Sequence, residues 1–124
     1  MSDILNLMIH IWDMGTTDWL GYNNQEQYSF HHLIKKSDGG EKIISNGAVL
    51  HQSSHSYLHT IEYYDLDKYL YLNNILKEVN MQKQMTSKEQ LQKIRSVLLE
   101  FQREYEGKES SRGKPIIKKE YRLR

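Results

Sequence analysis

Two apolar stripes with helical period occupy the second half of the chain, and they constrain its fold more than any other feature. The first consists of residues spaced three or four apart: Leu66, Tyr69, Leu72, Leu76 and Val79. The second has the same spacing: Leu91, Ile94, Leu98, Phe101 and Tyr105. Thr86 and Glu89 form a capping-box pattern before the second stripe, and Gly107 suits its end. The pair predicts an antiparallel helical hairpin at about residues 65–106, with both stripes facing the core.

The first half of the chain predicts shorter elements. Residues 27–34 carry the aromatic and branched side chains of a strand, and residues 47–51 predict a second short strand. The sequence SDGG between them, at residues 37–40, is a strong loop signal. Ser53 or Ser54 is placed to cap a following helix, and the apolar spacing after Asp3 predicts an N-terminal helix. Together with the hairpin, these elements predict an α+β fold.

Length and composition indicate one globular domain. A chain of 124 residues suits a single core, and 38% hydrophobic with 27% charged residues is typical of folded rather than disordered proteins. The chain has no cysteine, which excludes disulfides and thiolate metal sites and fits a reducing compartment. No apolar run reaches the length of a membrane span, and the N-terminal stretch has Asp3 and Asp13 instead of a basic leader. We therefore expect a cytoplasmic protein without membrane association.

The formal net charge of +1 is unevenly distributed. From Gly107 onward there are seven Lys or Arg and two Glu, a net charge of +5. The preceding body has ten basic and fourteen acidic residues, a net charge of −4. A basic end on an acidic body is an unusual arrangement for a nucleic-acid-binding protein. We predict a single domain at residues 1–107, followed by a basic flexible tail at 108–124.

Five of the six histidines lie between positions 31 and 59. His55 and His59 are four residues apart, so on a helix they share one face and can bind one ion. His31 and His32 are neighbours on a strand and point in different directions, so one can join the ion while the other faces a substrate. For a bare pair of histidines a structural or surface role is the usual alternative. Two further histidines and a nearby Asn46 favour a metal site.

The segments HHLIKKSDGG, at residues 31–40, and NGAVLHQSSHSYLH, at residues 46–59, resemble the core of the HNH endonucleases. These are also called ββα-metal or His-Me finger nucleases. The family core consists of Asp or His followed by His, an apolar pair, a glycine-containing loop, Asn, an apolar strand and a helical His-x-x-x-His or Asn. Each element occurs here in order. The resemblance implies a ββα-metal core at about residues 27–62, preceded by the N-terminal helix and followed by the helical hairpin.

The resemblance also implies roles for individual residues. His32 matches the general base, and Asn46 matches the residue that braces the loop and orients that base. His31, His55 and His59 match the metal ligands. Three imidazoles form a borderline-soft site, so Zn or Ni should bind more tightly than Mg, while Mg or Mn supports activity. The base removes a proton from the water that attacks the phosphorus, and a histidine suits this at neutral pH.

The chain departs from the family in two respects. Many members carry two Cys-x-x-Cys knuckles, whereas His51 and Ser54 stand at the positions of one such pair, so the hairpin must brace the core instead. His51 is then a strand-end or surface histidine rather than an additional ligand. The only cations near the predicted site are Lys35, Lys36 and Lys42, which are expected phosphate partners or, equally, a solvated loop face. The basic tail is a further source of phosphate contacts.

Two functions from different classes follow from the resemblance. The first is a small metal-dependent DNA endonuclease of phage or mobile-element origin, acting in the cytoplasm of a bacterial host. The alternative is a phage-encoded anti-CRISPR protein that uses the same fold to bind and inhibit a Cas9-type effector protein. The acidic body and five candidate surface aromatics favour protein recognition: Trp12, Trp19, Tyr22, Tyr63 and Tyr64. An accessory role in restriction or packaging also fits the motif.

Overall fold

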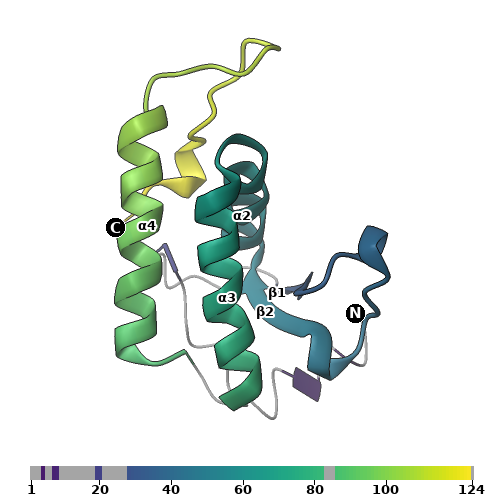
Figure 1. Ribbon diagram of the computed structural model, residues 1–124. Coiled ribbons are helices and arrows are strands. Elements are labelled where there is room, and N and C mark those ends of the chain that lie inside the picture. The colour runs from purple at the N-terminus through teal and green to yellow at the C-terminus, as the bar shows by residue number, and fades with distance from the viewer. Residues whose placement is uncertain (1–3, 5–6, 9–18, 21–27, 83–85, 124) are drawn as a thin grey trace.

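The computed structural model describes residues 4, 7–8, 19–20, 28–82 and 86–123. Within these ranges the fold is α+β, as predicted, with a two-stranded antiparallel sheet and three α-helices. The elements follow the order β1 (Tyr28–His32), β2 (Gly47–His51), α2 (Gln52–Tyr64), α3 (Leu66–Gln82) and α4 (Lys88–Tyr105). Helix α3 lies between α4 and the sheet, and α2 packs against both α3 and the strands (Figure 1).

The two strands pair with His31 opposite Ala48 and His32 opposite Gly47. Both predicted strands are confirmed, and β2 has the predicted bounds of Gly47–His51. All five residues of β2 are buried, because the sheet is covered by helices and the β1 side chains. Gly47 is required at its position, since a Cβ there would overlap the Phe30 ring. This register pairs His31 and His32, the last two residues of β1, with the first two residues of β2.

The predicted helical hairpin is confirmed as α3 and α4. The buried stripe positions are, on α3, Tyr69, Leu72, Leu76 and Val79, and on α4, Ile94, Leu98 and Phe101. Leu66, the first residue of the predicted stripe on α3, is exposed, contrary to the prediction. The capping box lies one residue later than predicted. Ser87 Oγ accepts from the backbone N–H of Gln90, and the side-chain oxygen of Gln90 accepts from the backbone N–H of Ser87. Ser87 has the extended backbone that an N-cap requires. Gly107 follows α4 with a φ of +79°, the left-handed conformation that ends many helices.

The expectation of a flexible tail at 108–124 is corrected for residues 108–123. Ile116, Ile117 and Tyr121 are buried and belong to the main hydrophobic core. The Tyr121 ring stacks on Tyr57 at 4.8 Å, and its hydroxyl lies 2.5 Å from Ser56 Oγ. The segment returns alongside α2 and α4 (yellow in Figure 1). Burial of this apolar cluster outweighs the repulsion among the surrounding cations, so the domain extends beyond residue 107.

The predicted N-terminal helix falls largely outside the described residues. Ile4, Leu7 and Met8 are described and helical, and Met8 is buried in a small cluster with Phe30, Val49 and Val79. The predicted cap at Ser53 or Ser54 is wrong, because α2 begins at Gln52 directly after β2. Among the helices of the described ranges, none combines the length and apolar character needed to cross a membrane.

Candidate metal centre

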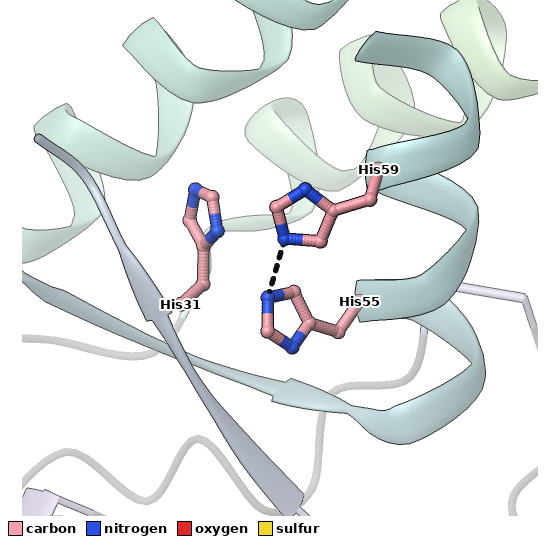
Figure 2. Close-up of side chains that lie close together, drawn as sticks. All are labelled: His31, His55 and His59. Atoms are coloured by element: carbon pink, nitrogen blue, oxygen red, sulfur yellow. Dashed lines mark hydrogen bonds between the residues drawn. The ribbon is translucent and has the colours of Figure 1, made fainter. Parts of the chain in front are cut away.

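Three histidines from two elements converge at one point of the structure. His31 comes from β1, and His55 and His59 come from successive turns of α2 (Figure 2). One nitrogen of each ring lies within 4.8 Å of the others, a spacing that allows all three to bind one ion. The predicted ligand residues therefore lie together.

His31 has one ring nitrogen occupied and one bare. Its Nε2 lies 2.8 Å from Asn73 Oδ1, and Asn73 Nδ2 donates to the Leu33 carbonyl at 3.0 Å. Since the Asn73 amide uses its nitrogen as a donor, its oxygen accepts, and His31 must carry its proton on Nε2. His31 Nδ1 is buried, and within the described residues it has no hydrogen-bond partner. Burial lowers the pKa of His31 to about 4, so the ring is neutral near pH 7.

His55 and His59 are joined through their ring nitrogens. His59 Nδ1 donates to Glu62 Oε1 at 3.1 Å, and its Nε2 lies 2.9 Å from His55 Nε2, a hydrogen bond in the metal-free chain (dashed in Figure 2). Ser29 Oγ lies 2.9 Å from His55 Nδ1 and 3.3 Å from the Leu50 carbonyl oxygen. The single N–H of a neutral His55 can therefore donate either to His59 or to Ser29, and the second tautomer leaves its Nε2 open to an ion. Burial lowers the pKa of His55 to about 3.

This arrangement fits a divalent metal ion. One nitrogen of each imidazole faces a common point, and the other nitrogens lie against oxygens of Asn73, Ser29 and Glu62. Oxygen partners of this kind orient histidines that bind metals. A cation would satisfy the buried Nδ1 of His31 and would replace the hydrogen bond between the two Nε2 atoms. Three protein ligands leave room for further oxygen ligands, as in catalytic rather than structural sites.

His32 lies beside this centre. It lines a cleft of about 590 Å³ whose wall also includes Phe30, His31, Lys35, Lys36, Ser37, His55, His59, Glu62 and Tyr69. The His32 ring packs edge-on against Phe30, with centroids 4.9 Å apart. Partial burial, with the nearby cations of Lys36 and Lys42, lowers its pKa below 6.5. His32 therefore faces the same space as the three converging histidines.

Asn46 holds the loop that follows His32. Its Oδ1 accepts from the Ile34 backbone N–H at 2.7 Å, and its Nδ2 donates to the carbonyls of Ile34 at 3.1 Å and Glu41 at 2.9 Å. Gly40 permits this close approach, since a Cβ there would overlap the Ile34 carbonyl oxygen. Asn46 thus fixes the backbone two residues after His32.

The three predicted phosphate-binding lysines have different surroundings. Lys35 lines the cleft and forms an ion pair with Glu62, which in turn accepts from His59. Lys36 lines the cleft near His32. Lys42 lies 5.7 Å from the centre of the Phe30 ring. Lys36 is therefore the better placed of the two cleft lysines for an anionic substrate, because Lys35 already neutralises a carboxylate.

Sequence reasoning missed the residues that orient the ligands. Glu62 lies three residues after His59, and that helical spacing was a usable signal. Ser29 and Asn73 gave no comparable signal, since they approach from a strand and from a different helix. His51 is a strand-end residue as predicted, but it is buried rather than at the surface. A second cleft of about 430 Å³, lined in part by Ser56 and Tyr121, reaches His55 and His59 from the C-terminal segment.

No protein-family model matches the chain, and no curated protein or solved structure shows significant similarity to it. The described geometry therefore defines an α+β protein with a candidate three-histidine metal centre, on which the functional argument rests.

Proposed function

We propose that the chain is a small metal-dependent DNA endonuclease of the HNH type, with a ββα-metal core formed by β1, β2 and α2. The observation that carries this proposal is the convergence of three imidazole nitrogens in a cleft that also contains His32. The order strand, loop, strand, helix supports it, because that order delivers His31, Asn46, His55 and His59 in the sequence typical of the family.

The donor set restricts the choice of metal. Imidazole nitrogens favour Zn, Ni or Mn over Mg for tight binding, while Mg or Mn remain the expected ions for turnover. When bound, a divalent ion supplies stabilisation of the charge that develops on the phosphate during cleavage. The chain itself supplies three imidazoles, each oriented by an oxygen at its other nitrogen.

His32 is the proposed general base. Its lowered pKa keeps it neutral near pH 7, so it can accept a proton from the attacking water. Asn46 fixes the backbone of the loop after β1 and so limits the movement of His32. Lys36 supplies a positive charge on the cleft wall for a phosphate oxygen.

The ordered C-terminal segment supports DNA as the partner. Its cations are held against the body by Ile116, Ile117 and Tyr121 instead of being spread along a free chain. Duplex binding requires several phosphate contacts, which the acidic body alone is poorly arranged to make. The segment reaches the second cleft through Glu120 and Tyr121, and its cations Lys118, Lys119 and Arg122 flank these two residues in the chain.

A plasmid-nicking assay tests the proposal. We expect the full chain to convert supercoiled plasmid to open circles with Mn²⁺ or Mg²⁺, and His32→Ala to lose this activity while retaining metal affinity. Lys77→Ala, on the exposed surface of α3, is a control expected to cleave normally. Absence of cleavage by wild type with any divalent metal would count against a nuclease.

The alternative, an anti-CRISPR protein that binds a Cas9-type effector, receives less support. Trp19 is buried and Tyr64 is half-buried against the core, so neither is an exposed aromatic, contrary to the prediction. Tyr63 is 80% exposed, while Trp12 and Tyr22 lie outside the described residues. Of the five candidates, Tyr63 alone is exposed within the described residues, so the predicted aromatic surface has little support. Inhibition of a Cas9–guide complex that survives His32→Ala would favour this alternative over the nuclease.

A further inference from the structure

Helix α3 contributes a side chain to the candidate metal centre, although it lies outside the segment that resembles a nuclease core. Asn73 is 4% exposed and joins His31 of β1 to the Leu33 carbonyl just beyond it. The two bonds come from one amide, so they fix the position of the imidazole and of the strand end together. The metal-facing side of His31 is opposite this contact, where Nδ1 is bare.

The orientation of the Asn73 amide follows from both bonds. If the amide were rotated by half a turn, its oxygen would lie about 3 Å from the Leu33 oxygen, and two acceptors would repel. The observed orientation therefore presents only an acceptor to His31. A neutral histidine has one N–H, and this acceptor selects the form that carries it on Nε2. Without Asn73, the proton could equally occupy Nδ1 and block metal binding.

We propose that Asn73 is a positioning residue of the metal centre, which holds His31 in the Nε2–H tautomer so that Nδ1 binds the ion. This inference rests on the proposed metal centre and adds α3 to it. Residues that orient histidine ligands in this way change metal affinity by about 10- to 100-fold when they are lost.

Asn80 provides a matched control on the same helix. It is also buried, and its Nδ2 donates to the carbonyls of Ile44 and Gly47, each at 2.7 Å. Asn80 therefore links α3 to the backbone at the start of β2, whereas Asn73 links α3 to β1 and the residue after it. Both of these hydrogen bonds of Asn80 are to backbone carbonyls, and neither involves an imidazole. Replacing Asn80 removes a buried amide of equal size without touching an imidazole.

The experiment compares metal affinity in folded protein for three variants of the full chain. Asn73→Leu has nearly the same volume and removes the acceptor, so Zn²⁺ or Co²⁺ should bind about 10- to 100-fold more weakly. Asn73→Asp keeps an acceptor for His31, although its second oxygen would repel the Leu33 carbonyl, so its affinity should lie above that of Asn73→Leu. Asn80→Leu should lower stability and leave affinity unchanged. Titration calorimetry, with circular dichroism to establish folding, measures each value.

A second measurement needs no variant. Nitrogen-15 NMR of the metal-free wild-type chain should show His31 protonated on Nε2 and bare at Nδ1, and added Zn²⁺ should shift the Nδ1 resonance.

The outcomes separate this inference from the proposed function. A wild-type chain that binds neither Zn²⁺ nor Co²⁺ overturns the metal centre and the role of Asn73 with it. A wild-type chain that binds metal overturns only the role of Asn73 if Asn73→Leu binds equally well, if Asn73→Asp loses as much as Asn73→Leu, or if His31 is protonated on Nδ1.

Discussion

The Nε2 atoms of His55 and His59 lie 2.9 Å apart and form a hydrogen bond in the metal-free chain. A bound cation would take the lone pairs of both atoms in place of that bond. Because a ligand that binds only the folded chain stabilises it, metal affinity at this pair should also be measurable as stability.

Zinc should stabilise the fold through these two rings. At a Zn²⁺ concentration one hundred times its dissociation constant, the free energy of unfolding should rise by about 2.7 kcal/mol. His55→Ala and His59→Ala should abolish the increase, because each removes a ligand, whereas His32→Ala should retain it. Urea unfolding after treatment with EDTA, with and without added Zn²⁺, measures the difference. Loss of the increase in His32→Ala would place His32 among the ligands instead.

Acid should destabilise the metal-free protein. Burial lowers the pKa of His31 to about 4 and that of His55 to about 3, against 6.5 for an ordinary histidine. The unfolded chain therefore binds more protons than the folded chain between these values, and stability falls as the pH drops from 6.5 toward 4. His31 alone accounts for about 3 kcal/mol. Urea unfolding in EDTA should show a smaller dependence on pH in His31→Leu than in wild type.

The site could be predicted from the sequence only where its residues are close along the chain. His55 and His59 share a helix, and the strand and loop signals predicted that His31 and His32 lie on β1 and Asn46 directly before β2. Asn73 is 42 residues from His31 and lies among buried apolar residues of α3, where a polar residue carries no periodic signal. The C-terminal segment was misjudged because its charge dominated the interpretation. Its apolar pair, Ile116 and Ile117, was the signal that it packs.

The C-terminal segment should contribute strongly to stability through Tyr121. Tyr121→Ala removes a fully buried ring stacked on Tyr57 and should cost about 3–5 kcal/mol. Tyr121→Phe keeps the ring and removes only the bond to Ser56, so it should cost about 1 kcal/mol. Arg112→Ala, at an exposed position of the same segment, should be nearly neutral. A flexible tail would instead make all three variants indistinguishable from wild type in thermal unfolding.

Lys36 should contribute to DNA affinity more than Lys35. Lys36→Ala should weaken binding of duplex DNA and reduce the salt slope of the binding constant by about one unit, because one phosphate contact is lost. Lys35→Ala should chiefly disturb Glu62 and His59, and so weaken metal binding. Fluorescence anisotropy at several salt concentrations gives the slope, with Lys77→Ala as the control. An unchanged slope in Lys36→Ala would mean that the cleft is not where the DNA backbone lies.

Two adjacent glycines should respond differently to the same substitution. Gly39 has a φ of +87°, and a Cβ at this position would meet no other described atom within 4 Å, its chain neighbours aside. Gly39→Ala therefore meets only backbone strain of about 1 kcal/mol. Gly40→Ala would place its Cβ on the Ile34 carbonyl oxygen and 2.9 Å from Asn46 Nδ2. The loop would have to move, and the bonds that hold the backbone after His32 would break.

We therefore expect Gly40→Ala to lower nicking activity far more than Gly39→Ala, and to resemble Asn46→Ala, which removes the same bonds from the other side. Zn²⁺ affinity should change little in any of the three, because the loop holds no ligand. Plasmid nicking and Zn²⁺ titration on the same preparations separate the two effects. Equal activity in Gly39→Ala and Gly40→Ala would show that the brace between Asn46 and Ile34 does not control His32.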